Sequence, residues 1–319
     1  MTRQTRYFVL GAGGVLLVGL CTGLFAYLNR GAAFAIRAES PAELTFVPAE
    51  ASIVAYANVR EVMLSEFRDR VRRLTPHGID RDRLEQYLGL SLEEDIDHVV
   101  AFLAPGADPG RPRGLALFRG RFDMTRLEAV ARRGGATLSE QAGTRIVSID
   151  TGDPGVLAMG FMEPGLVAVG DLTAVQDAAD RSTGSADITS NPVMMRLLDH
   201  VDNSSNAWAV GRFGDLNALG VVPEEVLARM PPIAAFAVDG RVNGGVSGSL
   251  AIEGRDDQAG QNLRDVVRGF MALAQLQTTG RPELQAMIDS LQLGGTGATV
   301  TLSFWLPSEA LDLIFSTAN

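Results

Sequence analysis

Apolar and polar residues alternate along most of the chain in short stretches that have the periods of strands and helices. Strand-like apolar patterns occur at residues 51–60, 98–105, 113–122, 144–150, 155–161 and 165–171. Apolar residues recur at helical spacing at residues 61–74, 80–90, 123–133 and 172–182. Asp123 opens the third of these helical segments, where an N-cap is expected. The pattern predicts an α+β fold with mainly antiparallel sheets.

The second half of the chain repeats this order of elements. Its strand, helical segment and two long strands lie at residues 206–213, 223–230, 232–242 and 245–255. The two long strands flank Asn243 and Gly244, a dipeptide typical of hairpin turns, and a further helical segment follows them. The sequence therefore predicts an internal duplication into two similar α+β units, at residues 46–201 and 202–319.

One stretch near the amino terminus has neither period. From Tyr7 to Leu28 the chain has 22 residues without a charge. At about 1.5 Å per residue, a helix of this length crosses a hydrocarbon core of roughly 30 Å. Aromatic residues lie near both ends, where amphipathic rings favour the headgroup region. The sequence predicts a short tail at residues 1–6, a transmembrane helix at 7–28 and a linker at 29–45.

Other interpretations of this stretch fit the residues less well. The glycines within residues 11–14 lack the preceding strand and following acidic residue of a dinucleotide-binding turn. A lipoprotein signal ending at Cys21 would need a small residue in place of Leu20. Cleavage after residues 33–35 (AFA) stays open, although the apolar run is longer than a usual signal-peptide core. An uncleaved signal-anchor is therefore favoured.

The charges that flank this stretch bear on the location of the rest of the chain. Arg3 and Arg6 precede it, and Arg30 and Arg37 follow it, so the positive-inside rule gives only a slight preference. A long polar domain crosses a membrane largely regardless of its charges. We predict a single-pass protein of the bacterial inner (cytoplasmic) membrane with its soluble domain in the periplasm.

Small residues follow one face of the predicted membrane helix. Gly19 and Gly23 are spaced four residues apart, and Thr22 and Ala26 continue nearly the same face. In lipid, small side chains let helix backbones approach closely enough for packing to hold them together. These four residues are candidates for contact with other membrane-protein subunits, while residues 7–28 as a whole would contact the bilayer.

Composition excludes several classes of function. The net charge is −10, which disfavours binding to nucleic acid, and all 28 basic residues are arginine. Without lysine, the chain has no Walker A nucleotide site, Schiff-base chemistry or Ser-Lys hydrolase. Cys21 is the only cysteine, and His77, His98 and His200 lie far apart in sequence. We expect no metal, nucleotide or other cofactor.

One short motif has a possible catalytic meaning. Residues 150–152 (DTG) follow an apolar strand and resemble the Asp-Thr-Gly loop of aspartic proteases, where two such loops bring paired carboxylates together. This chain has Asp153 where that family carries a small residue, and the second half has no matching loop. Asp and Gly also supply the geometry of an ordinary polar turn, which is the favoured interpretation of Asp150.

A stretch of the first unit resembles a family without a known activity. Residues 46–67 read FVPAEASIVAYANVREVMLSEF, and the resemblance rests on Pro48, Ala49, Ala51, Val54, Ala55, Tyr56, Ala57 and Val59. They are similar to the opening of an uncharacterised family of single-pass, membrane-anchored bacterial envelope proteins. The resemblance implies an envelope-exposed domain and brings no catalytic residue with it.

Together these features predict a non-catalytic, membrane-anchored extracytoplasmic binding protein. Its expected role is that of an accessory or scaffolding subunit of a larger bacterial membrane complex, for example a respiratory or photosynthetic one. Two alternatives stay open. One is an aspartic-protease-like hydrolase that uses Asp150, and the other is a carrier of an apolar ligand enclosed by the sheets.

Overall fold

The structure of the protein is a computed structural model. It describes residues 41–65, 91, 94–106, 112–150, 156–181, 184–214, 232–242, 245–277, 285 and 288–307. The chain divides between Arg196 and Leu197 into two compact units, which we describe separately.

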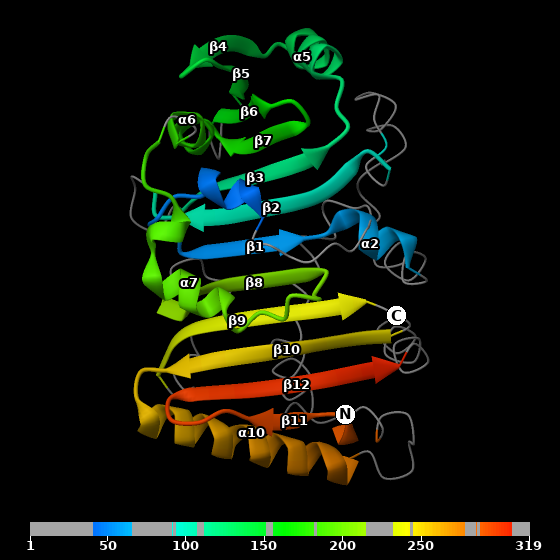
Figure 1. Ribbon diagram of the computed structural model, residues 1–319, viewed down its shortest axis with the longest axis vertical. Helices are drawn as coiled ribbons and strands as arrows, with labels where there is room; N and C mark the ends of the chain where they lie inside the picture. The colour runs from blue at the N-terminus through cyan, green and yellow to red at the C-terminus, as the bar shows by residue number, and fades with distance from the viewer. Residues whose placement is uncertain are drawn as a thin grey trace. The chain divides into compact units, whose positions relative to one another are not determined.

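The first unit is built on seven antiparallel strands (Figure 1). The strands are β1 (Ile53–Ala57), β2 (Ile96–Ala104), β3 (Arg113–Gly120), β4 (Thr137–Gln141), β5 (Thr144–Asp150), β6 (Val156–Glu163) and β7 (Leu166–Asp171). They are hydrogen-bonded in the order β1-β2-β3-β7-β6-β5-β4. The strands β4 to β7 follow one another through three hairpins, so each pairs with its neighbour in sequence. This arrangement leaves β4 at the end of the sheet.

The helices of the first unit are short. They are η1 (Ala42–Phe46), α2 (Val59–Leu64), α5 (Met124–Arg133), α6 (Leu172–Arg181) and η2 (Ile188–Ser190), and α7 (Pro192–Leu198) crosses the boundary between the units. Of these, α2, α5 and α6 pack against strands of the sheet. Asp123 caps α5 as predicted, because its carboxylate accepts a hydrogen bond of 2.9 Å from the Arg126 N–H.

The two faces of the β4–β7 region are covered by different helices. Alanine-rich α6 packs on one face, where a Cβ on Gly160 would lie only 2.7 Å from Val175. On the opposite face, Leu127 of α5 packs with Val147, Phe161 and Val167. Because successive residues of a strand point to opposite faces, these strands need apolar residues on both.

The second unit has five antiparallel strands and one long helix. The strands are β8 (Ala207–Arg212), β9 (Ile233–Val242), β10 (Gly245–Gly254), β11 (Gln292–Gly294) and β12 (Thr299–Pro307). They are ordered β11-β12-β10-β9-β8, and α10 (Asp257–Gln277) follows β10 in sequence. The predicted pair of long strands around residues 243 and 244 is confirmed by the β9–β10 pairing.

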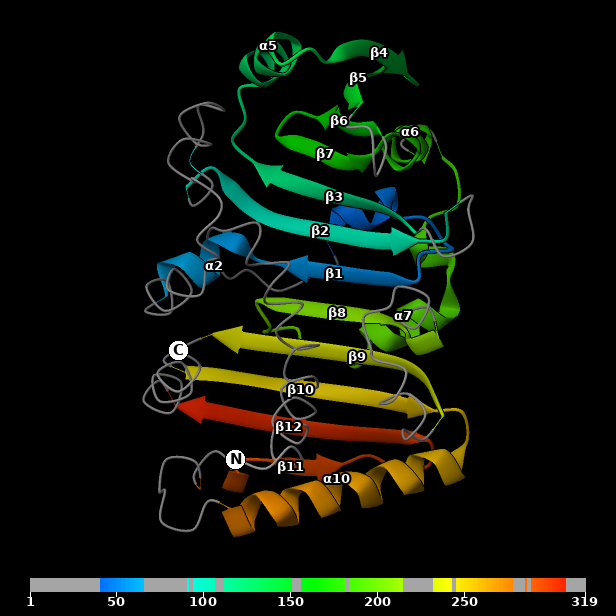
Figure 2. The same cartoon turned by 180° about the vertical axis from the view of Figure 1, so that it is seen from behind.

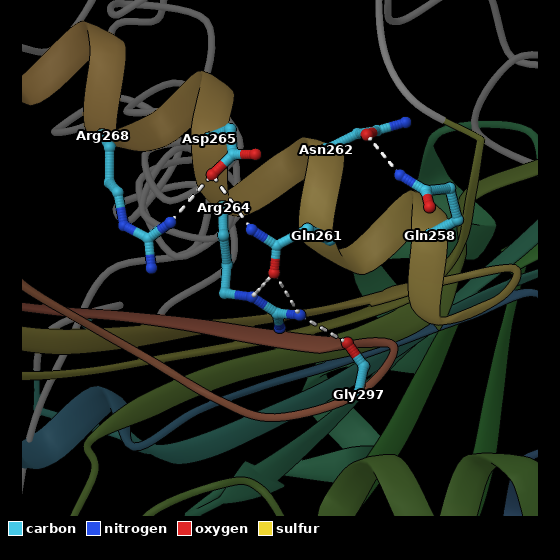
Figure 3. Close-up of polar contacts among 7 residues, drawn as sticks. All are labelled: Gln258, Gln261, Asn262, Arg264, Asp265, Arg268 and Gly297. Carbon is cyan, nitrogen blue, oxygen red and sulfur yellow. Dashed lines mark hydrogen bonds and ion pairs between the residues drawn. The ribbon is translucent and has the colours of Figure 1, made fainter.

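Hydrogen bonds near its amino-terminal end hold α10 in place. Asp256 accepts a hydrogen bond from the Ala259 N–H, and Ala259 and Leu263 are buried. Figure 3 shows the polar side of this helix, where Arg264 donates a 2.9 Å hydrogen bond to the carbonyl of Gly297. Arg264 also donates a 3.0 Å hydrogen bond to the carbonyl of Thr299. Arg264 thus ties the helix to the segment that enters β12.

The predicted fold class was wrong. The described residues form twelve antiparallel strands with few helices, rather than two similar α+β units behind a transmembrane helix. The first unit inserts a four-strand meander, β4 to β7, whereas in the described residues of the second unit β11 and β12 follow the long helix. The helical periods at 123–133 and 172–182 were real, but these helices only cover a sheet that is held together by hairpins.

The transmembrane and signal-anchor prediction also needs correction. Among the described residues, which begin at 41, no helix has both the length and the apolar character needed to span a bilayer. The stretch predicted to do so, residues 7–28, lies outside the described residues, so the structure gives the anchor no support.

The turn between β4 and β5 generates a first prediction. Its two central residues, Ala142 and Gly143, have φ angles of 49° and 79°, as a type I′ turn requires. Alanine in this left-handed region costs about 1 kcal/mol, whereas asparagine adopts it more readily. Ala142→Asn should raise the free energy of unfolding by about 0.5–1 kcal/mol in chemical denaturation. Gly143→Ala should lower it, and equal stability of all three proteins would contradict the turn assignment.

Candidate functional site

The predicted catalytic candidate, Asp150, lies at the carboxyl end of β5. It is exposed and stands opposite Val156 in the β5–β6 ladder. Catalytic carboxylates are usually buried beside a charged partner that tunes them. The rest of the Asp-Thr-Gly motif, residues 151 and 152, lies outside the described residues.

The other sequence candidates are dispersed or undescribed. Gly19, Thr22, Gly23 and Ala26, the predicted helix-contact residues, lie outside the described residues. Of the histidines, His200 Nε2 lies 4.0 Å from Glu253 Oε1 in the second unit, and His98 lies on β2 in the first. Within the described part of the chain, no group of three or more acidic, histidine or cysteine side chains could hold a metal ion.

A buried carboxylate that sequence reasoning missed organises the polar residues of the first unit. Glu43, in η1, has a side chain only 3% exposed. Its Oε1 accepts a 2.7 Å hydrogen bond from Arg119 Nε on β3, and its Oε2 lies 3.0 Å from His98 Nε2 on β2. His98 Nε2 is close to this oxygen but poorly aligned for a hydrogen bond, so the contact is an ion pair when the imidazole is protonated. Both oxygens of Glu43 are therefore occupied.

The environment of Glu43 strongly favours its charged form. Burial alone would raise the pKa of this carboxyl group, but the contacts with His98 and Arg119 outweigh burial and hold the pKa at about 2. The ring of Tyr56 on β1 lies 5.6 Å from that of His98. Burial and the charge of Glu43 raise the pKa of Tyr56 to about 12, so its hydroxyl stays protonated at neutral pH.

The contacts of Glu43 with His98 and Arg119 hold η1 against strands β2 and β3. Arg119 also contacts Glu163 at 3.1 Å, so one guanidinium joins η1 on the sheet to the end of β6. A general base needs a pKa near the working pH. The pKa of Glu43 lies far below that range, and its carboxylate instead fastens η1 to β2 and β3. The sequence signal was weak, because Glu43 is one acidic residue in a segment predicted to be a linker.

A second buried carboxylate lies in the second unit. Asp239 on β9 accepts hydrogen bonds from Ser205 Oγ and from Ser249 Oγ on β10. Burial raises the pKa of Asp239, because water no longer stabilises its charge, although the two serines act in the opposite direction. Hydroxyl donors on both oxygens again indicate a structural role.

The first unit also exposes a strip of apolar side chains. Leu138 on β4, Ile149 on β5 and Leu157 on β6 are 44%, 38% and 48% exposed. The strand register places all three on the sheet face that also carries Val147 and Met159, beside α5. We call Leu138, Ile149 and Leu157 the apolar strip. Exposed apolar residues that are contiguous on one surface mark sites of interaction with other molecules.

The second unit has its own exposed apolar side chains, at Val266, Phe270, Leu273 and Leu276 of α10. They lie between Leu263, which is buried, and the carboxyl end of the helix. The apolar strip differs from them because one of its members, Leu138, lies in an end strand of a sheet, whereas these residues lie on a helix. That combination makes the strip the stronger candidate for a functional surface.

Comparison with known proteins identifies a fold but no family. No family model matches the chain, and no curated protein matches it. Two crystal forms of TP0453 are similar in structure, each at 10% identity. Form I gives a TM-score of 0.51 over 88% of this chain and 99% of that one, and form III gives 0.52 over 86% and 97%. Identity this low shows a shared fold alone, and the resemblance at residues 46–67 stays a prediction.

The buried Glu43 carboxylate predicts how stability depends on pH. Its pKa is about 2 in the folded protein and 4.5 when unperturbed, so the unfolded chain takes up the proton first as pH falls. Glu43 should therefore contribute fully above about pH 4.5 and lose about 3 kcal/mol of stabilisation as pH falls toward 2.

Denaturation of the wild type and of Glu43→Gln between pH 6 and pH 2 measures this contribution. Glu43→Gln should be less stable at pH 6 and should lose less stability on acidification. Glu140→Gln removes an exposed carboxylate of the same chemistry and serves as the control. If the stability of Glu43→Gln fell with pH as steeply as that of the wild type, the stabilising role of the Glu43 contacts would be refuted.

Proposed function

We propose that the protein is a non-catalytic binding protein that serves as an accessory or scaffolding subunit of a larger assembly. The observation that carries this proposal is the apolar strip of Leu138, Ile149 and Leu157 on the sheet of the first unit. A location outside the cytoplasm and protein subunits as partners stay predictions from the sequence.

The strip has the character of a protein contact surface. Three large aliphatic side chains on adjacent strands remain more than a third exposed, at a cost that burial by a partner would remove. Charged side chains flank it, since Arg145 pairs with Glu128 at 2.7 Å and also lies over the ring of Phe161. An apolar centre with a polar rim is the usual anatomy of a specific interface.

The polar clusters support binding rather than catalysis. The buried Glu43 carboxylate contacts Arg119 and His98, and Asp239 accepts hydrogen bonds from two serine hydroxyls. Asp150 lies exposed at a strand end. These arrangements favour a stable scaffold over a site that must change its protonation state during a reaction.

The proposal predicts that substitutions in the strip weaken partner binding. The full chain, tagged and purified in mild detergent, is used to identify co-purifying subunits, and each subunit is then tagged to recover the chain in reverse. Ile149→Ser combined with Leu157→Ser should reduce reciprocal recovery about tenfold or more, because each buried aliphatic side chain contributes roughly 1–2 kcal/mol.

Leu64→Ser is the matched control for the strip variant. Leu64 is a leucine of α2 that is 66% exposed and lies outside the strip, so its loss should leave recovery unchanged. Equal recovery of partners by the wild type and the strip variant, with both proteins folded, would refute the proposed surface.

A separate variant tests the enzyme alternative. Asp150→Asn keeps the size of the side chain and its capacity to accept a hydrogen bond but removes the charge. At an exposed strand end it should change the free energy of unfolding by less than about 1 kcal/mol and leave partner recovery intact. A peptidase activity of the purified wild type that disappears in this variant would favour the hydrolase over a binding protein.

A further inference from the structure

We infer that β4 is a docking edge, to which an extended segment of a partner protein adds as one more antiparallel strand. This inference rests on the proposed function and specifies how the partner is engaged. Strand addition of this kind combines main-chain hydrogen bonds for affinity with side-chain contacts for specificity.

The edge of β4 is accessible. In both views β4 lies at the end of the strand order of the first unit, and its described pairing is with β5 (Figure 1 and Figure 2). The first four residues of β4, Thr137 to Glu140, have exposed side chains. A strand in this position presents main-chain donors and acceptors that can template another strand.

The hairpin geometry identifies which groups are available. Gln141 and Thr144 flank the two-residue turn and form its closing hydrogen-bonded pair. Hydrogen-bonded and non-hydrogen-bonded pairs alternate along an antiparallel ladder, so Thr137 and Ser139 also direct their main-chain groups toward β5. Leu138 and Glu140 consequently direct their N–H and C=O groups away from β5, toward the open edge.

Three of the usual features that block a strand edge, proline, lysine and a bulge, are missing from β4. Its sequence, TLSEQ, contains no proline, and the chain contains no lysine, the residue most often used to discourage edge pairing. The β4–β5 register runs through all five pairs without a bulge. One acidic side chain, Glu140, is the only charge on the strand.

The apolar strip continues from this edge across the sheet. Leu138 on β4 is its outermost member, and Ile149 and Leu157 follow on β5 and β6, on the same face. A strand added beside β4 would place every second side chain on that face, next to Leu138. Partner residues next to the added strand would then cover Ile149 and Leu157.

The chemistry of the edge favours a partner segment over a second copy of this chain. Two β4 strands paired about Ser139 would bring two Glu140 carboxylates onto one face as diagonal neighbours, which repel. A segment that carries a basic and an apolar residue two positions apart, on the same face, places an arginine or lysine opposite Glu140 and an apolar side chain opposite Leu138.

A defined peptide provides the probe. A fluorescent, end-blocked peptide of sequence TRTVTV carries its arginine and its two valines on one face of an extended strand, and its affinity for the full chain is measured by fluorescence anisotropy. The same peptide with N-methyl groups on alternate residues has no main-chain N–H groups to donate along the edge that faces β4. We expect binding of the first peptide, loss of at least about tenfold with the second, and slower hydrogen exchange at the Leu138 and Glu140 amides.

Variants of the edge separate hydrogen bonding from charge. Glu140→Pro removes an outward N–H without removing a β4–β5 hydrogen bond and should lower affinity about tenfold. Glu140→Gln keeps that N–H and should lower affinity only two- to threefold, as expected for an exposed ion pair. Equal binding of the two peptides, or unchanged exchange at both amides, would overturn the inference even if Glu140→Pro failed to fold.

The outcomes also distinguish this inference from the proposed function. If the strip variant loses its partner while Glu140→Pro retains it, the partner covers the sheet face without adding a strand, and only the inference fails. If neither variant affects partner recovery, the proposed surface fails as well. Binding by a second copy would show as a dimer in sedimentation that Glu140→Pro converts to monomer, and would replace the partner segment.

Discussion

The alternation of side chains along a β-strand controls the surface chemistry of the first unit. Each strand from β4 to β7 sends one residue to each face in turn, so a sheet that is apolar on both faces needs cover on both. Helix α6 covers one face with four buried small residues, and α5 covers part of the other. Leu138, Ile149 and Leu157 are the apolar residues that α5 does not cover.

The same sheet depends on a buried ionic contact at its other end. Glu43 fastens η1 over β2 and β3, and its two oxygens are held by side chains from both strands. Because the carboxylate is enclosed, its charge is kept by its neighbours rather than by water, which is why its pKa lies so far below the ordinary value.

An open strand edge beside an apolar strip combines two sources of binding energy. Main-chain hydrogen bonds contribute affinity and define the direction of an added strand, while aliphatic contacts add free energy of burial and select its register. Neither source requires a reactive group, and this agrees with the structural use of Glu43 and Asp239. The shared fold with TP0453 shows that the arrangement of strands is not unique to this chain.

The sequence by itself determined the local elements whose signals lie within a few residues. Asp123 predicted the start of α5, and the apolar periods predicted α6 and the β9–β10 pair. It also excluded lysine and thiolate chemistry through composition. Only the tertiary structure decided the antiparallel order of the strands, that Glu43 meets His98 and Arg119, and that Leu138, Ile149 and Leu157 share a face. Strand register places His98 opposite Arg119, and the packing of η1 brings Glu43 to Arg119 across 76 positions of sequence, which no local pattern encodes.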